Sequence, residues 1–384
     1  MPPAESPTAT EIQSAVEGVL RLLHDCPEHN MLWVYEDLMA GRRPRVCPLI
    51  LSRGQTASEI AHSTPAGAWG LAPPEQVLLD SLRGIPRALA SGNLYTPVLG
   101  SCFGTATVAS AFGCELDLGN PLNPGGVKAY LPLSTFDGAG VPDVNTAGCF
   151  PTIRERLECY HAHTPPEIKF GLADLQGPLN NAHMILGTEL FIAMRTEPDR
   201  LHHLLQLITD FMISAFATLR AWIGPDRLVP FIRDTNCLRE CSVNLISRAD
   251  YREFALPYDR QIVAALGEIA LHPCSGLHVF EETLRGLSNV RFSEWGVVSA
   301  AFAPCVTLDD ALAETAGRPL ILRGLEDLLS GDPEAPIKDH FARLDDHDLM
   351  MFTYSTGHYT PAQEPELIAL RRRFDDYYDD RYAI

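Results

Sequence analysis

Basic residues are scarce in this sequence. Lys and Arg together number 30 against 49 Asp and Glu, so the formal net charge at pH 7 is −19. A chain with this charge repels phosphate backbones and anionic lipids, so we expect no nucleic-acid partner and no membrane partner. An acidic balance is common among cytoplasmic enzymes and identifies no substrate by itself.

Targeting and membrane-spanning signals are also lacking. The first ten residues contain neither the basic nor the apolar segment of a secretory signal, and no uninterrupted apolar run reaches the roughly 18 residues of a membrane span. Ten cysteines are spread over positions 26 to 305 without the compact spacing of a disulfide framework. We therefore expect a cytoplasmic protein with reduced thiols, in which a cysteine beside other ligands indicates metal binding or catalysis.

Nucleotide-binding fingerprints do not occur: the sequence contains neither G-x-G-x-x-G nor G-x-x-x-x-G-K-[ST], so nucleotide binding has no support. What the sequence does contain is a globular composition. Hydrophobic residues make up 46% of the 384 positions, and the mean hydropathy is −0.01. A chain of this length can bury a large core without disulfide bonds.

Short apolar runs recur along the chain, and most are followed by an amphipathic helical pattern. This alternation is typical of a parallel sheet covered by helices. Eight runs favour closure into a (β/α)8 barrel, although an open doubly wound sheet fits the pattern almost as well. The predicted strands are Arg45–Leu51, Thr96–Gly100, Ile168–Gln176, Val229–Thr235, Ile269–Ser275, Val290–Gly296, Pro319–Gly324 and Leu349–Gly357. The predicted helices include Leu201–Ile223, Asp250–Leu266, Leu308–Ala316 and Glu364–Tyr378.

Two regions stand apart from this alternation. Residues 1–40 are predicted to form a helical extension, and residues 41–384 the barrel, which is the catalytic domain. The segment Phe103–Pro166 is rich in Gly and Pro and contains the run GNPLNPGG. We interpret it as an irregular insertion over the barrel mouth.

Polar residues close several of the predicted strands. The carboxyl ends of barrel strands share one face, so these side chains are expected to converge on one ligand. The candidates are Asp234, His272 with Cys274, Glu294, Arg323 and His358.

His272-Pro273-Cys274 is the sharpest local feature. On a strand, residues two apart point the same way, so the imidazole of His272 and the thiol of Cys274 lie on one face. Both are good zinc ligands, and a catalytic zinc takes three protein ligands and keeps an open position. His358, at the end of the last predicted strand, is the candidate third ligand. The alternative is a structural one, with Cys274 a core thiol and His272 a hydrogen-bonded core histidine.

Other pairs of metal-binding residues are weaker. Cys237 and Cys241 form a rival pair, but two cysteines four residues apart need further ligands to make a site. Cys305 follows a proline in a predicted loop. The histidine pairs lie in helix-like or polar segments and are expected at the surface: His202 with His203, and His161 with His163.

Each charged residue at a strand end could have a functional or a structural role. Arg233 or Arg323 could bind a substrate carboxylate through both guanidinium nitrogens, or could be paired with Asp234 or Glu294. Asp234 could orient a ligand imidazole, or accept hydrogen bonds from backbone amides.

From about Gly171 onward the sequence resembles the uroporphyrinogen decarboxylase superfamily, which also contains the zinc-dependent methylcobalamin:coenzyme M methyltransferases and related corrinoid demethylation enzymes. The resemblance implies a (β/α)8 barrel. The similar stretches follow in the same order and spacing: Leu175–Gly187, Ile246–Leu256 leading to Pro257, Leu271–Gly276, Leu320–Leu328 and Ser355–Glu366.

Within that superfamily the resemblance leans toward methyl transfer. His272 and Cys274 match the first two zinc ligands of the methyltransferases. Their third ligand is a Cys in a glycine-rich turn, whereas this turn holds His358, as the decarboxylases have it. The decarboxylases also carry an N-terminal F-R-Q-A-G-R signature, and a Tyr after the family's G-x-P-(F/W)-T segment, to which Leu175–Gly187 is similar. The corresponding regions here read Arg42-Arg43-Pro44-Arg45 and His183-Met184.

Together these features predict a zinc enzyme that moves a methyl group, carried by a corrinoid, to or from a small thiol or a related substrate. The predicted metal ligands are His272, Cys274 and His358, and the other catalytic candidates are Asp234, Glu294, His183 and Arg323. We expect a small-molecule substrate, methylcobalamin on a corrinoid partner protein, and a chain compatible with a homodimer. The alternatives are a metal-free decarboxylase-like lyase for a small carboxylated substrate and a barrel that only binds a small acid or a corrinoid partner.

Overall fold

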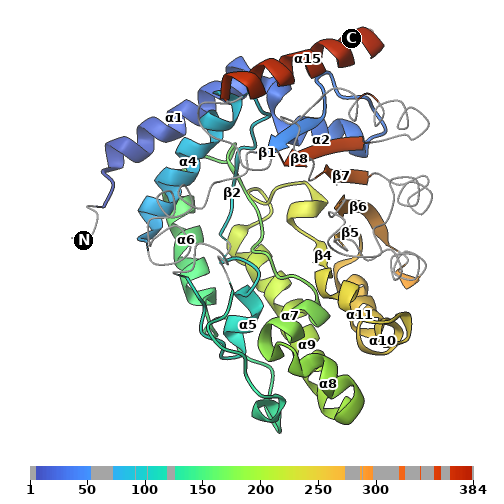
Figure 1. Cartoon of the computed structure of the whole chain (residues 1–384). Coiled ribbons are helices and arrows are strands. Elements are labelled where there is room, and N and C mark those ends of the chain that lie inside the picture. The colour runs from blue at the N-terminus through green and yellow to red at the C-terminus, as the bar shows by residue number, and fades with distance from the viewer. Residues whose placement is uncertain are drawn as a thin grey trace.

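Parallel strands and surrounding helices form the body of the molecule (Figure 1). The computed structural model describes residues 6–52, 72–90, 92–101, 103–118, 126–272, 286–287, 289–296, 320–324, 338, 350–355 and 364–382. Every strand ladder within these ranges is parallel. The predicted α/β class with a parallel sheet is confirmed.

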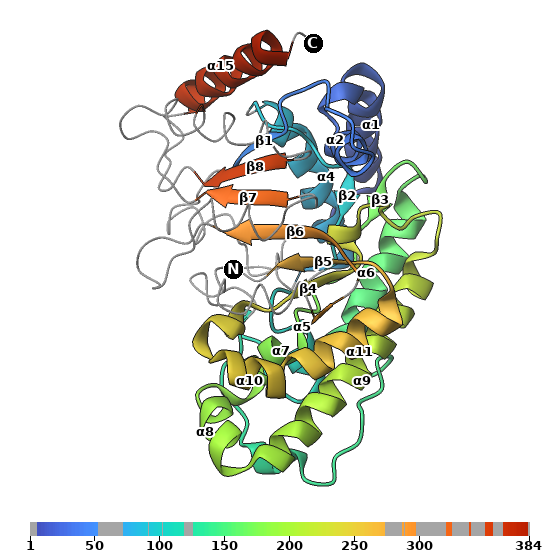
Figure 2. The same cartoon turned by 90° about the vertical axis from the view of Figure 1, so that its right-hand side faces the viewer.

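Six strands form the larger sheet. They lie in the order β1-β8-β7-β6-β5-β4. From β4 to β8 each strand lies beside the next one in the sequence, and the first strand, β1, lies beside the last, β8. Figure 2 shows β5 to β8 side by side with their arrowheads toward one edge. The bounds are Leu49–Ser52 (β1), Cys237–Arg239 (β4), Ile269–His272 (β5), Val290–Gly296 (β6), Leu320–Gly324 (β7) and Met350–Ser355 (β8).

The remaining strands, β2 (Val98–Leu99) and β3 (Lys169–Phe170), form a second parallel pair. A parallel bridge between Phe170 and Leu228 joins β3 to the segment that precedes β4. The described residues thus form two parallel sheets, and they include no ladder between β1 and β2 or between β3 and β4.

Helices follow most strands, as the alternation of patterns predicts. Between β1 and β4 they are α4 (Pro74–Ala90), α5 (Thr107–Ala111), α6 (Phe150–His163), α7 (Pro178–Leu186), α8 (Glu189–Thr196) and α9 (Pro198–Ile223), with the 3-10 turns η2 (Leu133–Phe136) and η3 (Ile232–Asp234). After β4 come η4 (Cys241–Leu245), α10 (Arg248–Phe254) and α11 (Leu256–Leu266), and the last helix is α15 (Glu364–Tyr382).

The N-terminal segment is helical, with α1 (Ala9–Asp25), η1 (Pro27–His29) and α2 (Met31–Met39). Thr8 and Glu11 form a reciprocal capping box that starts α1. Ile12, Val16 and Val19 form the buried stripe of this helix, which packs on α4. The apolar periodicity of the sequence predicts this helix correctly.

The C-terminal helix α15 is tied to the start of the sheet. Arg371 is buried, and its guanidinium donates to the backbone carbonyls of Cys47, at 2.9 Å, and of Leu49. The Tyr378 hydroxyl donates to the carbonyl of Pro44 at 2.8 Å. Because these carbonyls lie just before and at the start of β1, the last helix is fixed beside the first strand (Figure 1).

Two elements differ here from the sequence-based expectations. The fourth strand is not Val229–Thr235: the amide of Val229 donates to Phe170, but Pro230 has no N–H to continue a ladder, and the chain turns through η3 before β4 begins. The single predicted helix Asp250–Leu266 is divided into α10 and α11, and Pro257 lies in the first turn of α11. The predicted helix Leu308–Ala316 lies outside the described residues.

The interpretation of Phe103–Pro166 as wholly irregular is also wrong in part. Its last residues form the regular helix α6, which packs against α4 and α9. Phe150, Ile153, Leu157 and Tyr160 are buried at helical spacing. The Gly and Pro content of the preceding residues hides this stripe.

Helix α9 is the longest core helix. By length and composition alone it could cross a membrane, yet 56% of its most apolar stretch is buried inside the protein. Phe211 and Met212 are among its buried residues. This burial is typical of the core helix of a folded domain.

Candidate functional site

The carboxyl ends of β4 and β5 bring two functional side chains together. Arg239 ends β4, His272 ends β5, and the two residues are partners in the parallel register. The amide of the next residue, Glu240, donates to the His272 carbonyl at 3.0 Å and extends this pairing. Register partners on adjacent parallel strands direct their side chains to the same face. A guanidinium and an imidazole therefore share one face at the edge where barrel enzymes hold their active sites.

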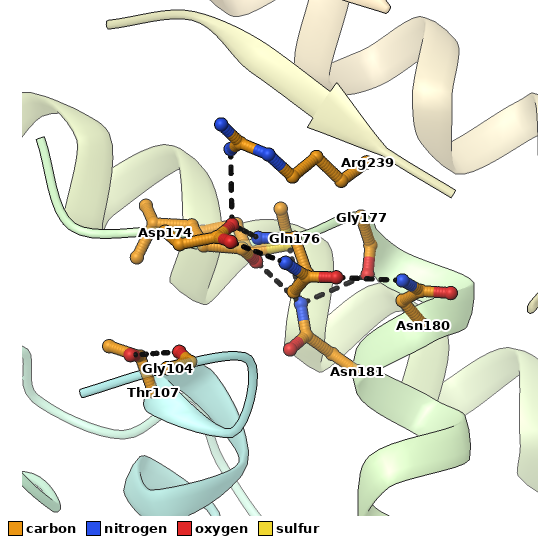
Figure 3. A network of polar contacts seen from close by, with 10 residues as sticks. Gly104, Thr107, Asp174, Gln176, Gly177, Asn180, Asn181 and Arg239 are labelled. Atoms are coloured by element: carbon orange, nitrogen blue, oxygen red, sulfur yellow. Dashed lines mark hydrogen bonds and ion pairs between the residues drawn. The ribbon is translucent and has the colours of Figure 1, made fainter. Parts of the chain in front are cut away.

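The loop after β3 provides a carboxylate for this edge (Figure 3). Asp174 Oδ1 accepts from the Arg239 guanidinium at 3.1 Å, and the two side chains are 25% and 20% exposed. The Gln176 amide and side chain donate to the two Asp174 oxygens at 3.0 and 2.7 Å. Because its partners fix Asp174 from two sides, the carboxylate holds Arg239 at the site and leaves the ion pair partly open to solvent.

Gln176 adopts a backbone conformation that side chains disfavour, with φ at +56°. Such a conformation costs about 1–3 kcal/mol and persists where the surroundings fix it. Two hydrogen bonds of the Gln176 side chain hold this conformation. Its amide nitrogen donates to Asp174, and its amide oxygen accepts from Asn180 Nδ2 at 2.8 Å. The strained residue thus connects the loop to helix α7.

Helix α7 begins directly behind this loop, with Pro178 in its first turn. Asn181 Nδ2 donates to the carbonyls of Leu175 and Gly177, at 2.8 and 2.9 Å. Asn180 Oδ1 accepts from the Ser242 amide at 2.6 Å, which joins α7 to the chain after β4. A network of buried amide groups therefore fixes the loop on one side and the end of β4 on the other (Figure 3).

Two buried carboxyl groups lie beneath this edge. Glu240 is 2% exposed and Asp259 is fully buried. The two carboxyls are close enough to affect each other electrostatically, and Asp259 Oδ2 accepts from the Tyr251 hydroxyl at 3.3 Å. Burial raises the pKa of Asp259 to about 7. Burial and the nearby Asp259 charge raise the pKa of Glu240 well above its usual range. Because burial disfavours two neighbouring carboxylates, the pair is not fully ionised at neutral pH.

His183 is the catalytic candidate whose surroundings are best defined. It lies on α7, half-buried, with Nδ1 at 2.9 Å from the Ser242 hydroxyl and the ring edge-on to Phe191. Burial lowers the pKa of His183, so the neutral imidazole is favoured. Ser242 joins His183 to the same amide network that positions the end of β4.

The remaining candidates are described only in part. His272 is 8% exposed at the end of β5. Asp234 lies in η3 before β4, not at the end of a strand, and its carbonyl accepts from the Leu172 amide at 3.0 Å. For Glu294 and Arg323 the structure gives backbone position alone: in the register Arg323 faces Gly296, two residues beyond Glu294.

The other two proposed zinc ligands, Cys274 and His358, lie outside the described residues, as does Cys305. Within the described part of the chain, no three His, Cys, Asp or Glu side chains form a metal-binding group. The rival residue Cys237 is buried in β4, and the cysteines that the structure describes are all free thiols. His203, His161 and His163 are exposed, as expected, whereas His202 stacks on Phe254.

Sequence reasoning missed four members of the site: Asp174, Gln176, Arg239 and Glu240. The first two lie in a run that reads as one long strand, although the D-x-Q-G-P pattern marks a turn. Arg239 and Glu240 follow Cys237, and they can be recognised as the end of a strand only when β4 is assigned to Cys237–Arg239.

An α/β protein with a parallel sheet and a polar site at the carboxyl ends of its strands is the class that these observations define. Residues 98–301, more than half of the chain, match the uroporphyrinogen decarboxylase (URO-D) family. The chain belongs to this family. Its structure is similar to that of a methyltransferase from Methanosarcina mazei, with a TM-score of 0.64 and 14% sequence identity over 90% of this chain and 99% of that one. At this identity the likeness shows a shared fold. No curated protein matches the sequence.

Proposed function

We propose that this protein is a zinc-dependent methyltransferase that moves a corrinoid-bound methyl group to a small thiol, within a closed (β/α)8 barrel. The observation that carries the proposal is the place of His272. It is buried at the carboxyl end of β5, beside Arg239, and is followed by Pro273 and Cys274. The fold shared with a methyltransferase supports the reaction class.

The proposed donors suit zinc. Histidine nitrogen and cysteine sulfur are its preferred ligands, and His272, Cys274 and His358 leave one position for substrate. Zinc, when bound, converts a thiol into a thiolate, which otherwise is scarce at neutral pH because a free thiol has a pKa near 8.5. Two neutral imidazoles and one thiolate leave the site with a net charge of about +1, which favours an anionic sulfur.

This chain's own residues have three tasks in the transfer. His272, Cys274 and His358 would hold the zinc, which would bind the substrate sulfur as a thiolate. Arg239, fixed by Asp174, would keep a positive charge near that sulfur. A corrinoid-bound methyl group would then be transferred to the thiolate, with the electron pair of the methyl–cobalt bond left on the corrinoid. The amide network behind Gln176 keeps these groups in place during the exchange.

A direct test is methyl transfer from methylcobalamin, free or on a corrinoid protein, to a panel of small thiols. We expect His272→Ala and Cys274→Ala to lose transfer, and His203→Ala, an exposed histidine on α9, to keep it. Full activity in Cys274→Ala would show that the site is wrong. If His358→Ala keeps zinc but loses transfer, His358 is an acid–base or substrate-orienting group, and Cys237, Cys241 or Cys305 becomes the next ligand to test.

A metal-free decarboxylase-like reaction on a small carboxylated substrate is the second candidate. The family match favours it, as does Arg239, which could bind a carboxylate. Purified protein incubated with uroporphyrinogen distinguishes the two. We expect no coproporphyrinogen, because the chain lacks the N-terminal arginine signature of that enzyme and is strongly acidic. Robust conversion of uroporphyrinogen to coproporphyrinogen would instead favour the decarboxylase-like reaction.

A further inference from the structure

A cleft of about 810 Å³ opens at the opposite end of the strands from the candidate site. Pro97, directly before β2, and Lys169, the first residue of β3, lie in its wall, whereas Arg239 and His272 end their strands. Strands that run parallel have all their starts at one end. A molecule in this cleft therefore cannot take part in chemistry at the strand ends.

Three aromatic side chains, Trp33, Tyr35 and Phe231, are among the residues that line this cleft. Tyr35 on α2 stacks on Phe231 with the ring centroids 3.6 Å apart, and both rings are buried. Trp33, on the same helix, remains 51% exposed, which is unusual for the largest apolar side chain. The volume is in the range of small-molecule sites. The shape and lining suit a compact organic molecule with an apolar body.

Charged side chains of both signs lie around the cleft, and the two in its lining that are exposed are acidic. Glu36 and Glu167 are exposed in its lining, and Lys169 is the cation among the lining residues. The Lys169 ammonium donates to the carbonyl of Asp226 at 2.8 Å. Arg227, next to Glu167 in space, is buried and directs its guanidinium to the carbonyls of Ile168 and Thr164.

We propose that this cleft binds a small organic cation, such as a quaternary ammonium attached to an aromatic or aliphatic body. Two carboxylates at the rim attract the charge, and the face of the half-exposed Trp33 can stabilise it through cation–π contact. The overall charge of −19 raises the local concentration of cations. The proposal does not depend on the reaction at the strand ends.

The test uses the full-length protein and three probes of matched shape, with binding measured by calorimetry and by ligand-observed NMR. They are (4-hydroxyphenyl)trimethylammonium, its neutral isostere 4-tert-butylphenol and the anion 4-hydroxybenzenesulfonate. We expect the ammonium probe to bind roughly three- to tenfold more tightly than the isostere, as a cation–π contact with added charge attraction gives. The anion should bind most weakly.

Variants locate the site. Trp33→Ala should weaken ammonium binding, and Glu36→Gln with Glu167→Gln should remove the preference over the isostere. A matched double variant, Glu155→Gln with Glu366→Gln, changes the same net charge at exposed positions elsewhere and should keep the preference. Equal binding of ammonium and isostere, no ammonium binding at millimolar concentration, or binding unchanged in Trp33→Ala would each overturn the proposal. Circular dichroism of every variant confirms that it is folded.

Discussion

The carboxyl group of Glu240 occupies the space that a side chain at Gly177 would need: a Cβ built there would overlap the Glu240 carboxyl atoms. Glu240 is buried and paired with Asp259, so it cannot swing into solvent. Gly177 therefore allows the loop after β3 to lie directly against the end of β4.

Gly177→Ala is expected to destabilise the fold by about 1–3 kcal/mol, as overpacking in a fixed interior does. Gly171→Ala is the matched control from the same loop, because its Cβ would have ordinary contacts, the nearest at 3.5 Å. Urea unfolding measures both. Equal loss of stability in the two variants would contradict the close packing of Glu240 on Gly177.

Asp174→Asn should weaken the loop by about 1 kcal/mol, because the ion pair with Arg239 is partly shielded and Gln176 loses a charged acceptor. Glu158→Gln removes the exposed Arg154–Glu158 pair on α6 and should cost about 0.5 kcal/mol or less. Denaturant unfolding of both variants tests this difference. If Asp174→Asn proves as mild as the surface variant, the Asp174 contacts do not hold the loop.

The carboxyl pair makes stability depend on pH. In the folded protein the pKa of Asp259 is raised to about 7 and that of Glu240 is also raised by burial, whereas in the unfolded chain ordinary carboxyls release their protons near pH 4. The stabilisation is complete at low pH and is lost as pH rises toward and through about 7. In Glu240→Gln an amide that does not titrate replaces one of the two carboxyls. The unfolding free energy of this variant should therefore decline less steeply between pH 5 and 8.5.

Glu155→Gln, an exposed change on α6, is the control for that measurement and should keep the wild-type slope. An unchanged slope in Glu240→Gln would show that the pair is not responsible.

Regular elements were predictable because their patterns are local. The strand β6 has the predicted bounds, and α9 begins three residues before its prediction because Pro198 suits a first turn. The error at β4 arose from Pro230, which interrupts an apolar run that continues in composition but not in hydrogen bonding. A proline inside a predicted strand is the sign that could have corrected it.

The site was less predictable, because its members are joined by contacts between distant segments. His272 could be singled out since two zinc-type ligands stand two residues apart. Asp174 and Arg239 stand 65 positions apart in the sequence and meet only in the folded chain, which no local pattern encodes. The raised pKa values of Glu240 and Asp259 likewise depend on burial between distant segments of the chain.

The zinc content of the full-length protein, purified without chelator, tests the central claim most directly. We predict about one zinc per chain, as one three-ligand site requires, with loss of the metal in His272→Ala and Cys274→Ala and full retention in His203→Ala. Elemental mass spectrometry on folded samples measures all four. A correctly folded wild-type protein without zinc, or a His272→Ala variant that keeps it, would contradict the account.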